Sequence, residues 1–182
     1  MNKAIKILKD GGVILHKTDT IWGLACDATN EQAIEKLRII KGRPDDKGFI
    51  ILISDISQLS IYVEKVPDIA WDLVEFAEKP LTVIYAKGKN LPNNAMANDG
   101  SLAIRLVKSE PCKQLIYIFG KPIISTSANI SGNSTPQKFD QIDQRIKEKA
   151  DFIEVFNGIE SSSQASIIVK LGINGDFSFI RK

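Results

Sequence analysis

Three short polar segments carry the residue types that could bind an anionic substrate. They are HKTDTIWGL at 16–24, KGRPDDKG at 41–48 and STSANISG at 125–132. Lys41 offers a point charge and Arg43 a planar fork of donors, which together suit phosphate or carboxylate oxygens. Ser125, Ser127 and Asn129 add neutral donors. Such a site is rich in cations and hydroxyls and poor in bases, so it favours phosphoryl or adenylyl transfer over acyl-enzyme chemistry.

Each of these segments also has a purely structural interpretation when it is taken alone. KGRP can end a helix, because cations are favoured at a helix C-terminus and glycine followed by proline stops the helix. STSANISG can be a solvated turn whose hydroxyls cap backbone groups. Asp19 can bond within its own turn, and His16 lies inside a strand pattern, so it is expected to be structural rather than a base.

Several common sequence motifs for nucleotide binding and hydrolysis are absent. The sequence has no G-x-x-x-x-G-K-[ST] phosphate loop, no G-x-G-x-x-G dinucleotide fingerprint and no G-x-S-x-G nucleophile elbow. The single histidine excludes a multi-histidine metal site. Cys26 and Cys112 match no metal-ligand spacing, so both are expected to be reduced thiols. A nucleotide would therefore have to be bound by other means.

The composition is that of a globular protein of ordinary size. The chain has 182 residues, of which 43% are apolar and 25% charged, and we expect one domain over residues 1–182. No apolar run approaches the roughly 20 residues of a membrane span, and the N-terminus lacks a signal-peptide pattern. We therefore expect a cytoplasmic protein without membrane contact. The net charge of +2 is too small to indicate a nucleic-acid partner.

Helices and strands alternate along the chain, and their ends hold the three polar segments. Helices are predicted at 2–10, 28–42, 67–78, 110–119 and 135–151. Strands are predicted at 12–18, 49–53, 81–86 and 101–107, from 121 onward, and at 151–157, 166–171 and 176–182. Thr29 or Asn30 is expected to cap the helix that ends at Gly42, and Thr135 the last helix. The alternation predicts a layered α/β domain, in which strand ends gather at a ligand-binding crevice.

Five motifs occur in order from about residue 11 to residue 133 and match the patterns of one family. KTDTIWGL is similar to P-T-[DE]-x-x-[YFW]-G-[LV], and KGRPDDKG is similar to K-x-R-P-x-D-K-G. KPLTVIY, SLAIRLV and STSANISG match P-[LV]-T, SLA[VI]R and S-T-S-A-N-x-S-G. By this combination the chain resembles the YrdC-type family of threonylcarbamoyl-AMP synthases, especially its short single-domain bacterial branch.

This resemblance implies an open, twisted, mixed α/β sheet flanked by helices, with a basic concave face. It implies a nucleotidyltransferase that condenses L-threonine, bicarbonate and ATP to threonylcarbamoyl-AMP and pyrophosphate. ATP would be a substrate used with Mg²⁺, without a tightly bound, protein-ligated metal. A partner threonylcarbamoyl transferase would then modify adenosine 37 of tRNA, and family members are linked to binding of tRNA or double-stranded RNA.

The same resemblance implies which residues form the site. Lys41 and Arg43 would be the catalytic pair around the ATP phosphates, in a set completed by Ser127 and Asn129. Arg105 would hold the threonine carboxylate, because a forked donor matches a planar anion. Replacing Lys41 or Arg43 is expected to reduce turnover while the melting temperature stays nearly unchanged. The further implied contacts are Thr82 and Arg181 with ATP, and Thr18, Ser125 and Ser166 with threonine.

The chain departs from the family pattern at four places. Lys17 stands where the family has proline, and AEKP at 77–80 replaces W-P-G-P. Ile167 replaces a common threonine, and the sequence ends at FIRK without the usual glycine. The first two departures leave the K-x-R and S-x-N residues intact, whereas the last two affect the implied C-terminal contacts.

Two other interpretations stay open at this point. One is a catalytically silent paralogue that binds double-stranded RNA or tRNA. Such paralogues tend to lose the K-x-R or S-x-N residues, and both sets are present here, which favours the enzyme. The other is a carbamoyltransferase module of the hydrogenase-maturation type, which normally lies within a much longer chain.

Overall fold

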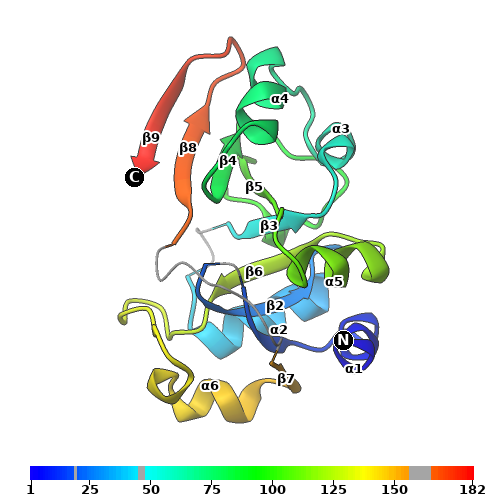
Figure 1. Ribbon diagram of the computed structural model, residues 1–182, viewed down its shortest axis with the longest axis vertical. Coiled ribbons are helices and arrows are strands. Elements are labelled where there is room, and N and C mark those ends of the chain that lie inside the picture. The colour runs from blue at the N-terminus through cyan, green and yellow to red at the C-terminus, as the bar shows by residue number, and fades with distance from the viewer. Residues whose placement is uncertain (19, 45–47, 156–164) are drawn as a thin grey trace.

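A nine-stranded mixed sheet forms the centre of the molecule (Figure 1). The computed structural model describes residues 1–182 except 19, 45–47 and 156–164. The strand order is β7-β1-β2-β6-β3-β5-β4-β8-β9, in which β1–β7, β3–β5 and β4–β8 are parallel pairs. The strands are β1 (Ile14–Lys17), β2 (Trp22–Asp27), β3 (Ile50–Ile53), β4 (Leu81–Tyr85), β5 (Leu102–Leu106), β6 (Ile123–Ser127), β7 (Phe152–Glu154), β8 (Ile167–Leu171) and β9 (Phe177–Arg181).

Helices lie against both faces of this sheet. They are α1 (Asn2–Lys9), α2 (Glu31–Lys41), α3 (Leu59–Tyr62), α4 (Asp68–Glu75), α5 (Cys112–Phe119) and α6 (Gln144–Lys149). Short 3-10 turns occupy Ile56–Gln58, Asn93–Ala95 and Phe139–Gln141. Among the described residues, none of the helices is long and apolar enough to cross a membrane.

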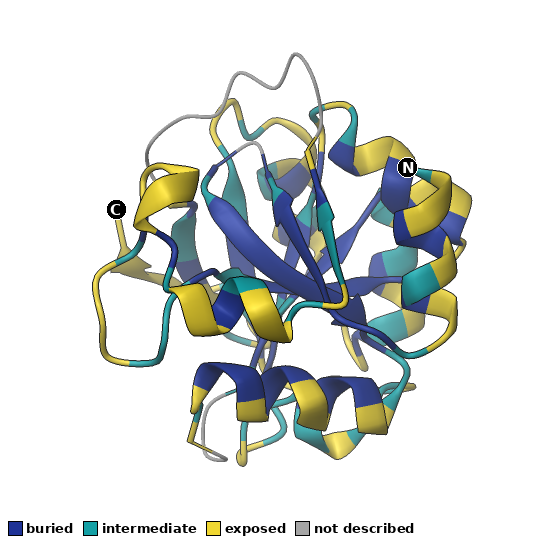
Figure 2. Ribbon diagram, turned by 90° about the horizontal axis from the view of Figure 1, so that it is seen from below, coloured by how far each residue is buried: buried dark blue, intermediate teal, exposed yellow. Residues whose placement is uncertain are grey.

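Side-chain alternation along the strands separates two apolar cores. In β3, Ile51 and Ile53 belong to the core that α2, α3, α4 and α6 cover, whereas Leu52 belongs to the core that α1 and α5 cover. In β2, Leu24 and Ala25 divide in the same way. Figure 2 shows the buried strands between helices whose outer faces are exposed. The α1/α5 core involves β1, β2, β3 and β6, so it covers only one part of its sheet face.

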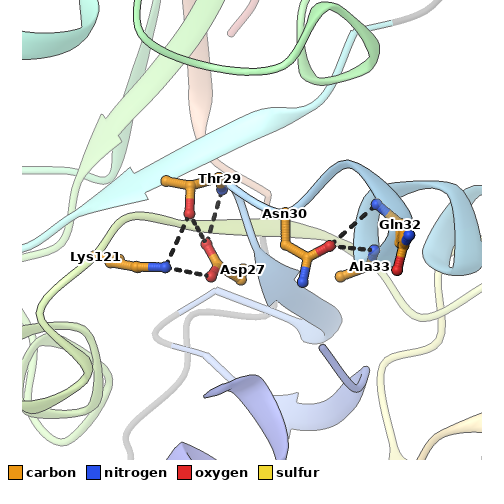
Figure 3. Close-up of polar contacts among 6 residues, drawn as sticks. All are labelled: Asp27, Thr29, Asn30, Gln32, Ala33 and Lys121. Carbon is orange, nitrogen blue, oxygen red and sulfur yellow. Dashed lines mark hydrogen bonds and ion pairs between the residues drawn. The ribbon is translucent and has the colours of Figure 1, made fainter. Parts of the chain in front are cut away.

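The helix α2 begins and ends where local chemistry requires. Asn30 has an extended backbone, and its side-chain oxygen accepts hydrogen bonds from the amides of Gln32 and Ala33, both at 3.1 Å (Figure 3). At the other end Gly42 has a φ of +57°, a left-handed conformation that favours glycine. Four apolar residues form its buried face: Ala33, Ile34, Leu37 and Ile40. The predicted helix is thus confirmed, with Asn30 rather than Thr29 as its cap.

The turn that precedes Asn30 is held by a buried carboxylate. Asp27, the last residue of β2, accepts hydrogen bonds from the amide and the hydroxyl of Thr29, at 2.8 and 2.7 Å (Figure 3). The Lys121 ammonium lies 3.0 Å from the second Asp27 oxygen. These contacts fix the direction in which the chain leaves β2.

Three parts of the sequence-based prediction differ from the structure, and the first is that the four-residue helix α3 was not predicted. β2 was not predicted, because it is buried on both faces and therefore lacks alternation. The helix predicted over 135–151 is wrong except near its end, where α6 lies. The Gln141 side chain accepts hydrogen bonds from the amides of Gln137 and Lys138, which stabilises a 3-10 turn, and Asp143 caps α6 instead. The predicted strand 151–157 is confirmed at β7, and its residues 156 and 157 lie outside the described residues.

The cap at Asn30 yields a stability prediction. Asn30→Ala is expected to lower the free energy of unfolding by about 1 kcal/mol, because two amides of the first turn lose their acceptor. Asn30→Asp keeps the acceptor and is expected to stay close to the parent protein. Urea denaturation of the three proteins measures the difference, and an unchanged midpoint for Asn30→Ala would contradict the assigned cap.

Candidate active site

A cavity of about 360 Å³ opens on the sheet face that α1 and α5 cover only in part. Its walls come from strands and turns, and no helical residue is among its described lining. Alternate positions of four strands point into it, and a fifth pair begins one residue before β8, as a single sheet face requires. These pairs are Ile50 and Leu52, Thr82 and Ile84, Ala103 and Arg105, Ser125 and Ser127, and Ser166 and Ile168.

Three arginines, Arg43, Arg105 and Arg181, give this cavity its charge. No carboxylate occurs among the described residues that line it. Arg105 is only 5% exposed and lies opposite Thr82 in the β4–β5 register. Burial, with the charge of Arg105 as a second cause, lowers the pKa of Arg181 from its usual value. The arrangement suits a polyanionic ligand.

Arg43 and Arg181 are both held by backbone carbonyls. Arg43 donates to the carbonyl of Gly48 at 2.5 Å, and its guanidinium carbon lies 4.8 Å from the centre of the Phe49 ring. Arg181 donates to the carbonyl of Ser166 at 2.9 and 2.7 Å. A carbonyl partner orients a guanidinium without neutralising its charge.

Gly48 itself leaves no room for a side chain. A Cβ atom there would lie 2.6 Å from the backbone nitrogen of Ala97. The close approach of these two backbones explains why glycine stands beside Phe49 at the cavity wall.

Hydroxyl groups line the floor of the cavity. The Oγ1 atom of Thr82 and the Oγ atom of Ser166 lie 2.8 Å apart, and both residues are buried. Ser125, also buried, faces Gly23, where a Cβ atom would come within 3.1 Å of the serine oxygen. These hydroxyls supply neutral donors and acceptors next to the arginines.

Thr18 lines the cavity, but its hydroxyl already bonds within the turn that follows β1. Its Oγ1 atom donates to the carbonyl of Ile21 at 2.7 Å and accepts from the amides of Thr20 and Ile21, both at 3.1 Å. The structure therefore places Thr18 at the cavity as a turn-closing residue. Asp19, for which local turn bonding was the structural interpretation, lies outside the described residues.

Lys41 meets Ser127 and Asn129, as the K-x-R and S-x-N pattern implies. Its ammonium donates to the carbonyl of Ser127 at 2.6 Å and to the carbonyl and side-chain oxygen of Asn129 at 2.8 and 3.3 Å. Burial and the neighbouring charge of Arg43 lower the pKa of Lys41 to about 7. Arg43 and Ser127 line the cavity, whereas Lys41 and Asn129 are not among its described lining residues. Lys41 thus ties the end of α2 to the loop after β6.

His16 is completely buried in β1, in keeping with the structural role expected for it. Burial, together with the charge of Arg105, lowers its pKa to about 4. The imidazole is therefore neutral at pH 7. Lys17, the departure in the opening motif, is the last residue of β1 and is not among the described lining residues.

Several lining residues were not identified from the sequence. Thr135, expected to cap a helix, lines the cavity instead. Alternation along β3 and β5 could have identified Ile50 and Ala103, because each precedes another lining residue by two positions. Other lining residues carry no such signal: Thr126 lies in β6, and four residues are brought in by turns or loops, Thr20, Ile21, Gly48 and Ala165. Residues 45–47 of the KGRPDDKG motif lie outside the described part of the chain.

The chain matches the sequence model of the Sua5/YciO/YrdC family, described as telomere recombination, over residues 6–182. It is 38% identical over 135 residues to the threonylcarbamoyl-AMP synthase of Pseudoalteromonas translucida, covering 72% of each protein. It is 32% identical over 183 residues to the threonylcarbamoyl-AMP synthase of Wigglesworthia glossinidia brevipalpis, covering 99% of this chain and 92% of that relative.

Solved structures of the same family share the fold. P. abyssi Sua5 complexed with L-threonine matches 93% of this chain with a TM-score of 0.82 and 25% identity, and this chain spans only 50% of that protein. E. coli YciO matches the whole chain with a TM-score of 0.81 and 26% identity, over 87% of its own length. The chain therefore belongs to the Sua5/YciO/YrdC family. The resemblance found in the five motifs is confirmed.

The burial of His16 predicts acid sensitivity. Below pH 6.5 the unfolded chain protonates this histidine, whereas the folded protein does so only near pH 4. The unfolded state thus binds the proton first, and stability falls from pH 6.5 to pH 4 by up to about 3 kcal/mol. His16→Asn is expected to lose less stability than the parent over this window, as measured by urea unfolding at both ends. Equal losses of stability in the two proteins would show that His16 does not cause the acid sensitivity.

The contacts of Lys41 change the expectation for its replacement. Lys41→Met keeps the apolar stem but leaves partly buried oxygens of Ser127 and Asn129 without this donor. We expect the free energy of unfolding to fall by about 1–3 kcal/mol, together with a loss of activity. Lys149→Met, at an exposed position of α6, is the matched control and is expected to change neither. An unchanged thermal midpoint for Lys41→Met would contradict the structural role.

Proposed function

We propose that this chain is a threonylcarbamoyl-AMP synthase, which condenses L-threonine, bicarbonate and ATP. The observation that carries the proposal is a single cavity that combines three arginines with several hydroxyls, without a carboxylate among its described lining residues. Both an amino-acid carbamate and a nucleoside triphosphate are anions, so a reaction between them needs a cationic site. The names of the curated relatives support the same activity.

Arg105 is proposed to hold the threonine carboxylate. It is the most deeply buried of the three arginines, Thr82 lies opposite it, and Ser125 and Ser166 add hydroxyls to the same cavity. A guanidinium binds a carboxylate through two parallel hydrogen bonds, which fixes the amino acid in one orientation. The L-threonine bound by P. abyssi Sua5 supports an amino-acid site in this fold.

Arg43 is proposed to bind the ATP phosphates with Ser127 and Arg181. Its guanidinium would stabilise the charge that develops on the departing pyrophosphate. We propose that Mg²⁺ enters with ATP as part of the substrate. Within the described chain no three His, Cys, Asp or Glu side chains gather into a metal site, so the triphosphate would supply the ligands. Lys41 and Asn129 would act indirectly, by holding Ser127 and the loop after β6 in place.

The chemistry is proposed to proceed through a carbamate. The neutral threonine amine combines with bicarbonate to give the carbamate and water, and a carbamate oxygen attacks the α-phosphorus of ATP. The bond between the α-phosphorus and its bridging oxygen breaks, and pyrophosphate leaves. Because the carbamate is already an anion, no strong protein base is needed, which fits a site whose nearby histidine is neutral. The enclosed floor would hold this short-lived anion close to ATP.

The product is proposed to pass to tRNA-modifying threonylcarbamoyl transferase machinery. Threonylcarbamoyl-AMP is an activated acyl donor, so a transferase must consume it before water does. This reaction would take place in the cytoplasm. Direct contact with tRNA or double-stranded RNA stays a prediction, for which salt-sensitive binding is the test.

Pyrophosphate release tests the proposed reaction. With MgATP and bicarbonate present, we expect release that depends on L-threonine. Arg105→Gln is expected to raise the threonine KM roughly 10- to 100-fold, because the carboxylate loses a charge-assisted pair, with little change in the ATP KM. Arg145→Gln is the matched control, since Arg145 is exposed and pairs with Asp143 away from the cavity.

Two results would contradict the proposal. Pyrophosphate release that is absent, or independent of threonine, from folded protein would rule out the synthase reaction. An equal loss of activity in Arg145→Gln and Arg105→Gln would show that the effect is not specific to the cavity.

A further inference from the structure

Thr20 is a cavity residue to which neither the motifs nor the proposed reaction assigns a function. It lies in the turn after β1, is 3% exposed, and lines the same cavity as Arg105. The Nη1 atom of Arg105 donates to its hydroxyl at 3.2 Å. The contact joins residues 85 positions apart in the sequence, so it links the first turn of the sheet to β5.

The Thr20 hydroxyl joins Arg105 to the turn after β1. Its Oγ1 atom lies 2.9 Å from the Oγ1 atom of Thr18, and either hydroxyl could donate in this contact. In both cases a lone pair of Thr20 accepts from Arg105. The Thr18 hydroxyl lies 2.7 Å from the carbonyl of Ile21, so a chain of hydrogen bonds links Arg105 through Thr20 and Thr18 to the backbone at Ile21.

This chain of hydrogen bonds ends on backbone groups that are themselves hydrogen-bonded. The turn is closed by the amides of Thr20 and Ile21, which both donate to the Thr18 hydroxyl, and by the Thr18 amide, which donates to the carbonyl of Ile21 at 3.2 Å. A guanidinium that donates to a side chain of this turn is restrained in its orientation. The Thr20 hydroxyl is neutral, so this contact does not itself offset the positive charge of Arg105.

We propose that Thr20 is a positioning residue that fixes the plane of the Arg105 guanidinium, so that it receives the amino-acid carboxylate through two hydrogen bonds. The inference rests on the proposed function, because it assumes that Arg105 binds that carboxylate. Bidentate pairing demands a fixed plane, and a site performs well only when the supporting contacts hold this geometry. Thr20 acts through Arg105 and makes no contact with the reacting atoms in this assignment.

Two substitutions separate the hydroxyl from the shape of the side chain. Thr20→Val keeps the shape and removes the acceptor, and we expect the threonine KM to rise roughly 10-fold, with kcat and the ATP KM within about threefold of the parent. Thr20→Ser keeps the hydroxyl and is expected to restore a threonine KM close to that of the parent. In an Arg105→Gln background, Thr20→Val is expected to add little, because the group it positions is absent.

The outcomes separate the inference from the proposed function. Calorimetric titration of the parent with L-threonine comes first, in the presence of α,β-methylene ATP. Absence of binding would contradict the proposed function, and the positioning role would fall with it. Binding by the parent and equal binding by Thr20→Val would overturn the positioning role alone. A rise of both KM values with a lower thermal midpoint would also overturn it, because it would indicate a general structural effect.

Discussion

The cavity exists because helices cover only part of one sheet face. Strand side chains alternate, so each strand must supply apolar residues to any face that a helix covers. α1 and α5 cover that face over β1, β2, β3 and β6, and the positions beyond them are free to be polar. Arg105 and Thr82, side by side on β5 and β4, occupy this uncovered part. The fold thus provides both the rigid floor and the space for ligands.

Neutral oxygen atoms orient the arginines of this site. Arg43 donates to the carbonyl of Gly48, Arg181 to the carbonyl of Ser166, and Arg105 to the hydroxyl of Thr20. Burial first, and the neighbouring charge of Arg105 second, lower the pKa of Arg181, so part of this shift reflects the cost of gathering like charges. Binding of an anionic ligand would relieve this repulsion, which couples occupancy of the cavity to its stability.

Local patterns predicted most helices, most strands and the meeting of the three polar segments. Asn30 and Gly42 mark the ends of α2 through hydrogen-bonding groups and backbone freedom that a sequence displays. The missed features depend on tertiary contacts instead. β2 has no polar face, and Thr135 lines the cavity because Gln141 stabilises a different turn. The motifs likewise predicted Lys41 as a site residue. Only the folded structure shows that its ammonium bonds to backbone oxygens and does not line the cavity.

The most direct test is a crystal structure of the protein with L-threonine and α,β-methylene ATP, which cannot release pyrophosphate. The threonine carboxylate is predicted to form two hydrogen bonds with Arg105, and the phosphates to contact Arg43, within the single cavity described above. Electron density for threonine elsewhere on the protein, or a carboxylate bound away from Arg105, would contradict the assignment of this cavity as the site where carbamate and ATP meet.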